Sequence, residues 1–329
     1  MKSLVLTRNG LKMADTPRPP LMPGDVRIEV RAVGICGTDL SIWQGNLEAK
    51  LPLVLGHEIA GVIDESSVED ITPGTIVTTE ASSFCGRCWY CANDMKSLCT
   101  AKKSLGITVD GGLAEYVAVP AESIHPLPPA VDIVSGTFAE PLAAAIQTHI
   151  QCPAKPHEIV VVIGSGKLGL LIAQVYDAFG ADVFLVGRNQ WKLGLARHLG
   201  LRNTINSSTG DWKKQILNAT SGLGPRLVVE ATGNTDGLKM ALEIVRGRGV
   251  VAMKSIHGLK SDINPSYIVE REVEIRGSTA GSYDMAIDML AKGRIEVKRL
   301  VSKEFGLDEG VKAFEHASQP SVTKVIVRV

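Results

Sequence analysis

Four of the six cysteines in the chain lie in one short stretch of sequence. They are Cys85, Cys88, Cys91 and Cys99, which are separated by two, two and seven residues. Thiols this close together would form strained disulfides, and we expect a reducing compartment because the sequence shows no secretion signal. The spacing also matches neither of the usual ferredoxin patterns for an iron–sulfur cluster. A tetrahedral zinc ion bound by four thiolates explains the short separations and predicts a structural site with no open position for chemistry.

A second group of candidate ligands lies in GICGTDLSIWQG, from Gly34 to Gly45, and in LGHEIAG, from Leu55 to Gly61. Cysteine, histidine and glutamate are all common zinc ligands. Each segment alone has an ordinary interpretation, since a cysteine between glycines is often a small buried residue and GHE can lie in a surface loop. The metal interpretation therefore depends on what accompanies these segments along the chain.

A glycine-rich turn follows an apolar run in the segment VVVIGSGKLG. Gly164, Gly166 and Gly169 have the GxGxxG spacing, and an amphipathic segment follows them. Such a turn lets the backbone approach a pyrophosphate closely, and the N-terminus of the next helix points toward the anion. The spacing recurs by chance, but a strand before it and a helix after it are the context that dinucleotide binding requires. We therefore predict a dinucleotide site here.

The second strand of this unit ends in the segment FLVGRNQWK. An NAD-binding protein places Asp or Glu here to hold the ribose hydroxyls, whereas this chain has Gly187 followed by Arg188. A guanidinium suits a phosphate monoester, so the sequence favours NADP(H) over NAD(H), with a solvated surface arginine as the alternative. The residues expected to bind the cofactor are Gly164, Ser165, Gly166, Lys167, Leu168 and Gly169, then Gly187, Arg188, Asn189 and Lys192, and finally Thr232.

These candidate residues belong to two kinds of predicted structure. From 26 to about 119 the chain has short alternating runs with frequent Gly and Pro, which indicates a small β-rich domain. After Pro141 apolar strands alternate with helices, which predicts a doubly wound α/β domain with a parallel sheet covered on both faces. We expect helices at 190–199, 211–219 and 235–245 and strands at 227–231 and 250–253. Helices near 283–291 and 308–317 and the final strand TKVIVRV should return to the first domain.

Composition excludes several classes of partner. The 35 basic and 35 acidic residues cancel and aromatic residues make up only 5% of the chain, so nucleic acid and anionic membranes are not expected partners. No stretch reaches the roughly 18 apolar residues of a membrane span. With 329 residues, 45% of them hydrophobic, the chain can build two cores, and we expect a cytoplasmic protein. The predicted domains are a catalytic domain at 1–140, a dinucleotide-binding domain at 141–277 and a C-terminal segment at 278–329.

Taken in this order, the CGTD and GHE segments, the cysteine loop and the glycine turn resemble those of the zinc-dependent medium-chain alcohol, polyol and sugar dehydrogenases. The resemblance runs from VRIEVRAVGICGTD to the last strand and implies a GroES-like catalytic domain beside a Rossmann domain. It implies a catalytic zinc bound by Cys36, His57 and Glu58, with Glu140 of FAEPLA bound directly or through a water molecule. Simple alcohol dehydrogenases have cysteine at this last position, and an acidic residue is typical of polyol, threonine and sugar dehydrogenases.

The resemblance also implies a path for the alcohol proton. A mixed set of sulfur, nitrogen and oxygen ligands leaves one position for a substrate oxygen, and the metal lowers the pKa of the alcohol. Thr38 is placed to accept the proton. Many relatives have a histidine five residues after the cysteine, where this chain has Ser41, so the proton would leave through the serine hydroxyl, a ribose hydroxyl or water.

Together these motifs predict a zinc-dependent oxidoreductase that transfers a hydride between NADP(H) and a secondary alcohol or ketone, in particular a polyol or sugar. The alternatives are a simple alcohol dehydrogenase or aldehyde reductase and, in another class, a non-catalytic NADP(H)-binding sensor, which has no need of an open metal site. Trp43 is either a pocket or a core residue, and Cys152 is expected to be an ordinary buried thiol. The habit of the family implies a homodimer or homotetramer.

Overall fold

The computed structural model describes residues 1–329 and divides into two compact units. The first unit comprises residues 1–140, 283–293 and 300–329, and the second comprises 141–282 and 294–299. The second unit thus continues past Gly277, where the sequence predicted its end, and it also takes up the short stretch 294–299. This stretch belongs there because the Gln174 side chain exchanges two hydrogen bonds with the backbone of Glu296, at 3.2 and 2.9 Å.

The second unit is built on a six-stranded parallel sheet. Its strand order, β13-β12-β11-β14-β15-β16, runs outward in both directions from its first strand, which is the doubly wound Rossmann arrangement. The strands are β11 (Ile159–Ile163), β12 (Asp182–Gly187), β13 (Asn203–Asn206), β14 (Leu227–Glu230), β15 (Val250–Met253) and β16 (Glu274–Gly277). The helices of this part of the chain are α4 (Ala139–Gln151), α5 (Lys167–Ala178), α6 (Gln190–His198), α7 (Trp212–Ala219), α8 (Gly237–Ile244) and α9 (Ser266–Glu270).

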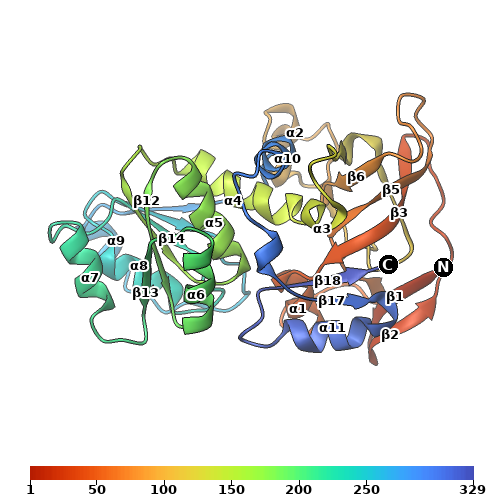
Figure 1. Ribbon diagram of the computed structural model, residues 1–329. Coiled ribbons are helices and arrows are strands. Elements are labelled where there is room, and N and C mark those ends of the chain that lie inside the picture. The colour runs from red at the N-terminus through yellow and green to blue at the C-terminus, as the bar shows by residue number, and fades with distance from the viewer. The chain divides into compact units, whose positions relative to one another are not determined.

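Helices cover both faces of this sheet (Figure 1). On one face, Trp212 of α7 and Leu242 of α8 join Val161, Val228 and Val251 of the strands in one buried cluster. On the other face, α5 and α6 pack against β11, β12 and β13. The central strands are apolar nearly throughout because neither of their faces meets water.

The first unit is β-rich. Its largest sheet has seven strands in the order β10-β6-β5-β3-β18-β17, with β9 also paired to β3, and the strands β2-β1-β4 and β7-β8 form two smaller sheets. The strands are β1 (Lys2–Thr7), β2 (Gly10–Asp15), β3 (Asp25–Gly34), β4 (Leu53–Val54), β5 (Glu58–Ser66), β6 (Ile76–Thr79), β7 (Ser82–Ser83), β8 (Lys103–Ser104), β9 (Tyr116–Pro120), β10 (Ile124–Pro126), β17 (Val301–Gly306) and β18 (Lys324–Arg328). The helices are α1 (Gly37–Trp43), α2 (Trp89–Ala92), α3 (Ile133–Gly136), α10 (Tyr283–Ala291) and α11 (Gly310–Ala317). The chain also has four 3₁₀ turns, η1 (Lys96–Leu98), η2 (Ala121–Ser123), η3 (Lys298–Leu300) and η4 (Leu307–Glu309). None of the helices in either unit is long and apolar enough to cross a membrane.

Three strands of the large sheet meet where the candidate ligands lie. The end of β3 pairs antiparallel with the start of β5, so that Gly34 lies opposite Glu58. On its other side β3 pairs with β18, and there Gly34 lies opposite Ile326. Cys36 follows β3 almost directly. The last strand of the chain therefore reaches the same point of the sheet as two motifs from its first sixty residues.

A polar cluster fixes α10 to the first unit. Tyr283 is buried, and its hydroxyl accepts the N–H of Ala81 at 3.0 Å. His125 of β10 stacks on Tyr283 and lies between two carboxylates, 3.3 Å from Glu80 Oε1 and 3.0 Å from Asp284 Oδ1. Burial opposes protonation of His125, but the hydrogen bonds to Glu80 and Asp284 outweigh it and raise its pKa.

Several predicted elements begin elsewhere in the structure. Helix α8 begins at Gly237, later than predicted, because the Asn234 side chain accepts the N–H of Asp236 and forms a turn before the helix. The helix predicted from 308 begins as the 3₁₀ turn η4 and becomes α11 at Gly310. The hydrophobic pattern does not predict β16, because every residue of this edge strand is exposed.

Candidate active site

A thiol, an imidazole and a carboxylate meet in the first unit. The ligand atoms of Cys36, His57 and Glu58 all lie within 4.8 Å of one another. Cys36 is partly exposed at the N-cap of α1, whereas His57 and Glu58 are buried at the start of β5. The pairing of β3 with β5 therefore brings together two segments that are separate in the sequence.

Asp39 positions this cluster, a role that the sequence reasoning missed. Its buried carboxylate accepts the N–H of Cys36 at 2.8 Å and the N–H of Gly56 at 3.1 Å, and Oδ1 lies 3.4 Å from His57 Nδ1. Burial alone would raise the pKa of Asp39, but the charge of His57 and these N–H groups outweigh it and lower the pKa. A carboxylate at Nδ1 leaves Nε2 of the imidazole for a metal. An aspartate three residues after the N-cap was the available signal, because it is a capping position.

Lys324 is the second residue beside the cluster that the sequence reasoning missed. Its ammonium forms an ion pair with the Glu58 carboxylate, and both side chains are 0% exposed. A Cβ at Gly34 would overlap both partners, so the pair occupies the space that a side chain would need there. Burial lowers the pKa of Lys324, while the negative charges of Cys36 and Asp39 oppose this change. One lysine in the apolar run TKVIVRV carries no signal of this contact.

The remaining predicted residues differ in how close they lie to the cluster. Thr38 Oγ1 lies 3.9 Å from Cys36 Sγ, and Ser41 follows three residues later on the same face of α1. Glu140 lies in the first turn of α4 and is not among the side chains gathered within 4.8 Å. Its negative charge, together with burial, raises the pKa of Tyr283. The structure therefore does not bring Glu140 into the group of ligand atoms.

The residues of the cluster fit a zinc ion. Sulfur, nitrogen and oxygen are the donor types of catalytic zinc sites, at about 2.0 to 2.3 Å from the metal, so ligand atoms around one ion lie a few ångströms apart. The separations among Cys36, His57 and Glu58 agree with this spacing. Three protein ligands leave a fourth position for another oxygen, in contrast to a structural site.

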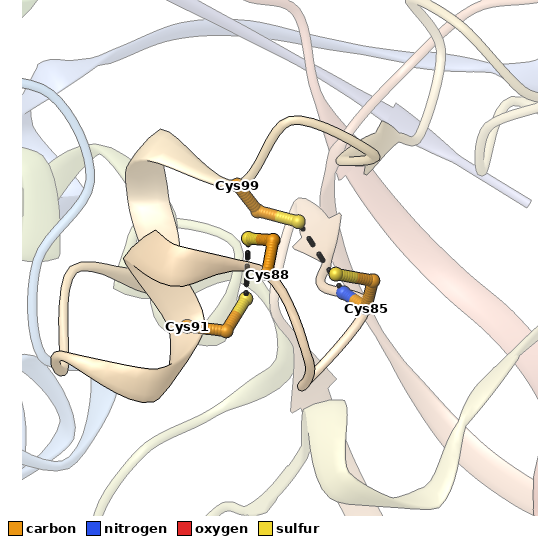
Figure 2. A group of neighbouring side chains, drawn as sticks. All are labelled: Cys85, Cys88, Cys91 and Cys99. Atoms are coloured by element: carbon orange, nitrogen blue, oxygen red, sulfur yellow. Dashed lines mark hydrogen bonds between the residues drawn. The ribbon is translucent and has the colours of Figure 1, made fainter.

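The other four cysteines form a separate cluster. Figure 2 shows the sulfur atoms of Cys85, Cys88, Cys91 and Cys99 directed toward one centre, and all four lie within 4.8 Å of one another. Sulfur atoms at about 2.3 Å from one tetrahedral zinc ion would be ~3.8 Å apart, which these thiols fit. The N–H groups of Cys91 and Thr100 lower the pKa of Cys88 to about 6, whereas burial raises the pKa of Cys91 to about 12.

The loop that carries these cysteines has little core of its own. Trp89 of α2 is 66% exposed, and Leu98 of η1 is exposed as well. The short ribbon β7-β8 closes the base of the loop, where the hydroxyls of Ser82 and Ser104 lie 2.8 Å apart. A bound metal would therefore supply the cross-link that apolar packing does not provide.

The glycine turn of the second unit has the geometry that dinucleotide binding needs. Gly164 has a φ of +119°, and a Cβ there would overlap the carbonyl of Ala231. A Cβ at Gly169 would overlap the carbonyl of Gly164, so this glycine lets α5 pack closely on the turn. Gly166, the N-cap of α5, faces open space. The turn thus presents bare backbone in front of a helix N-terminus.

At the end of β12 the predicted cofactor residues take different roles. Arg188 is exposed, and its guanidinium makes no ion pair within the chain. Gly187 is buried, and a Cβ there would overlap Ser165 Oγ, which is a steric reason for glycine at this position. Asn189 caps α6 by accepting the N–H of Lys192 at 3.1 Å, and burial lowers the pKa of the Lys192 ammonium.

Thr232 lies beside the glycine turn in a network that the sequence reasoning did not find. Its N–H and hydroxyl both donate to Glu230 Oε1, at 2.8 and 2.6 Å, and Ser255 donates to the same oxygen at 3.0 Å. The buried Glu230 ends β14, so its carboxylate orders the loop that packs against Gly164. Lys167 and Leu168 are partly buried in the first turn of α5.

Trp43 and Cys152 lie outside these sites. The Trp43 ring packs edge-on against Phe314 at 5.6 Å and joins the hydrophobic core of the first unit. Cys152 is buried in the second unit, where its carbonyl accepts the hydroxyl of Tyr176 at 2.8 Å. Trp43 is therefore a partly buried residue that packs against the core of the first unit.

Sequence comparison relates both units to known dehydrogenases. Residues 22–129 match the alcohol dehydrogenase GroES-like domain, and residues 168–292 match the zinc-binding dehydrogenase domain. The chain is 31% identical to a sorbitol dehydrogenase of Halalkalibacterium halodurans, with 99% of each chain covered. It is 30% identical to a D-arabitol-phosphate dehydrogenase of Enterococcus avium, covering 95% of this chain and 92% of that one.

Solved structures show the same relationship. A zinc-binding dehydrogenase from Sinorhizobium meliloti bound to NADP superposes with a TM-score of 0.93 at 32% identity, covering 100% of this chain and 99% of the other. An alcohol dehydrogenase from Escherichia coli complexed with NADH gives a TM-score of 0.92 at 28% identity, with 100% and 99% covered. The Rossmann and GroES-like architecture, the two clusters of ligand atoms and these relatives agree. The chain belongs to the zinc-dependent medium-chain dehydrogenase family.

Proposed function

We propose that this dehydrogenase transfers a hydride between NADP(H) and a secondary alcohol or its ketone, with polyols, sugars or related hydroxy compounds as substrates. The observation that carries the proposal is the convergence of Cys36, His57 and Glu58, because this donor set leaves a position for a substrate oxygen. The relatives named sorbitol dehydrogenase and D-arabitol-phosphate dehydrogenase support the substrate class. A simple alcohol dehydrogenase or aldehyde reductase is the alternative.

The side chains of the cluster have distinct tasks in this proposal. Cys36, His57 and Glu58 would hold the zinc ion, which when bound polarises the substrate oxygen and lowers the pKa of an alcohol. Asp39 orients the imidazole through Nδ1 and fixes the backbone at Cys36. Lys324 offsets the negative charge of Glu58, so that the buried site does not carry two uncompensated anionic ligands.

Helix α1 supplies the route for the proton. The Thr38 hydroxyl, 3.9 Å from the Cys36 sulfur, is placed to accept the alcohol proton. Ser41 lies on the same face of the helix and can pass it on, with a ribose hydroxyl or water as other routes. Glu140 would bind the zinc ion directly or through a water molecule, although it is not among the side chains whose ligand atoms lie within 4.8 Å of one another.

The end of β12 supports a preference for NADP(H). A buried glycine and an exposed, unpaired arginine stand where an NAD enzyme needs a carboxylate. The Arg188 guanidinium can bind a 2′-phosphate with charge-assisted hydrogen bonds. The S. meliloti relative was solved with NADP and the E. coli relative with NADH, so the shared fold accommodates either cofactor.

The metal assignment is tested by His57→Ala, with the exposed His198→Ala as the matched control. His57→Ala should abolish turnover with a panel of polyols, sugars and simple ketones, and should leave NADPH affinity close to that of the wild type. Zinc content measured on the same samples should fall by one ion per chain. Most of the activity surviving in His57→Ala would overturn the assignment.

The cofactor preference is tested by Arg188→Ala, with Arg246→Ala at the opposite end of the sheet as the control. Losing one charge-assisted hydrogen bond should lower kcat/KM for NADPH by roughly 10- to 150-fold. The kcat/KM for NADH should stay nearly unchanged. A Gly187→Asp variant is a poor test because its side chain would meet Ser165. A wild-type protein that used NADH as well as NADPH would contradict the preference.

The cysteine cluster is proposed as a structural zinc site. The loop contributes four thiols and little apolar packing, so the metal would stabilise it without taking part in the reaction. Such thiols remain reduced in the cytoplasm, which we propose as the compartment in which the enzyme works.

We also propose a homo-oligomer, either a dimer or a tetramer. Strand β16 is an exposed sheet edge, and a group of exposed apolar side chains lies on it and on the segment before it. These are Ile256, Leu259, Tyr267, Val269 and Ile275. Ile275→Lys should lower the mass measured by sedimentation, and a wild-type monomer at micromolar concentration would overturn the proposal.

A further inference from the structure

A buried lysine joins the ends of two neighbouring strands in the second unit. Lys254 directly follows β15 and is 7% exposed. Its ammonium donates to the carbonyl of Thr279 at 2.7 Å and to the carbonyl and hydroxyl of Ser278, both at 3.2 Å. Ser278 and Thr279 directly follow β16. Three oxygens from one short segment thus accept hydrogen bonds from the ammonium.

The segment after β16 is also held by helix α4. The hydroxyl of Ser278 lies 3.1 Å from Thr148 Oγ1 on α4. Gly281 approaches the same helix so closely that a Cβ would overlap the carbonyl of Ala143. Lys254 and α4 therefore restrain residues 278–282 from two sides, although no regular secondary structure is present there.

An ammonium in this place is costly compared with an apolar residue. Burying a charge is unfavourable before its hydrogen bonds are counted. An apolar side chain of similar size at 254 would avoid that cost, but it would leave the carbonyls of Ser278 and Thr279 without this donor. The ion therefore specifies the path of the backbone more than it adds stability.

The position of this tether points to the cofactor. In a doubly wound sheet the dinucleotide binds across the carboxyl ends of the strands, with one mononucleotide on each half of the sheet. The half formed by β11, β12 and β13 carries the glycine turn and Arg188 and so faces the adenosine part. The other half, β14, β15 and β16, faces the nicotinamide part, and Lys254 and the segment 278–282 lie at its carboxyl end.

We propose that Lys254 is a positioning residue that holds the backbone of residues 278–282 as the supporting surface for the nicotinamide half of the cofactor. The inference rests on the proposed binding of NADP(H). In this proposal Lys254 does not contact the reacting atoms, and it does not affect binding of the adenosine half of the cofactor.

The test separates the two halves of the cofactor. Binding of NADPH and of 2′,5′-ADP, which lacks the nicotinamide half, is measured by calorimetry for the wild type, Lys254→Met and the control Lys239→Met, whose lysine is exposed on α8. Lys254→Met should weaken NADPH binding by about tenfold, the size of one charge-assisted hydrogen bond. Its affinity for 2′,5′-ADP should stay within about twofold of that of the wild type. Lys239→Met should change neither affinity.

A second variant and a second readout cover the case in which Lys254→Met does not fold. Ser278→Ala removes one acceptor and the link to Thr148, and it should weaken NADPH binding by about two- to threefold, again with 2′,5′-ADP unchanged. In the cofactor-free protein, both variants should speed amide hydrogen exchange at residues 278–282 while the core strand β11 stays protected.

Two results would overturn the inference alone, namely equal losses for NADPH and 2′,5′-ADP, or unchanged NADPH affinity in both variants. A wild-type protein that binds 2′,5′-ADP but neither NADPH nor NADH would instead overturn the proposed function.

Discussion

Replacing Lys324 by methionine should be among the most damaging single changes in the first unit. The substitution keeps most of the side-chain volume and removes the ammonium that pairs with Glu58. Both side chains are completely shielded from water, so the carboxylate of Glu58 would remain buried with its compensating charge removed. Breaking a buried pair in this way costs about 3 to 5 kcal/mol. The metal-free protein should therefore lose about that much free energy of unfolding, as measured by urea denaturation.

A control on the same strand makes this expectation specific. Arg328 of β18 pairs with Glu304 at 2.7 Å, but both side chains are more than 40% exposed. Arg328→Met should therefore cost no more than about 1 kcal/mol. The double variant Lys324→Met with Glu58→Gln removes both charges and should recover a large part of the loss. Zinc should also reduce the loss, because the ion supplies positive charge beside Glu58. A Lys324→Met variant no less stable than Arg328→Met would refute the reasoning.

Three further predictions follow from other sites. Cys91→Ser should lower the melting temperature and release one zinc ion per chain without changing kcat in the protein that remains folded; iron in the intact protein would contradict this. Thr38→Val should lower kcat by about 10²-fold, the scale of a positioned proton-transfer group, while Ser41→Ala should cost much less; equal and severe losses would make the serine an obligatory relay. The pKa of His125 is raised by Glu80 and Asp284, so its stabilising effect should be complete below the ordinary histidine pKa and disappear as the pH rises through the raised value. Because Asp284 is largely exposed, the stability difference between wild type and His125→Gln should reach no more than about 1 kcal/mol at pH 6 and shrink toward pH 9, and a difference independent of pH would exclude this ion pair.

Much of the fold could be predicted because its signals are local. The apolar strands β11, β14 and β15 and the glycine turn are runs of adjacent residues, and their periodicity and spacing predict a doubly wound domain. The edge strand β16 escaped prediction because it is exposed, and an exposed strand has no hydrophobic pattern. The boundary of the second unit after Ser282 could not be predicted either, since it depends on contacts with residues far away in the chain.

The sequence by itself determined the residue types that can bind zinc and the spacing of the four cysteines, because ligands in one short loop can reach one ion without help from the rest of the fold. It also determined the glycines of the cofactor turn and the missing carboxylate at Gly187. The tertiary structure alone decided which residues support these groups. Asp39 reaches His57, and Lys324 reaches Glu58, only because β3 pairs with both β5 and β18. Burial is also decided by the tertiary structure. The residues next to Lys254 and Lys324 in the sequence do not show that these two charges lie away from water, because burial depends on elements that pack from distant parts of the chain.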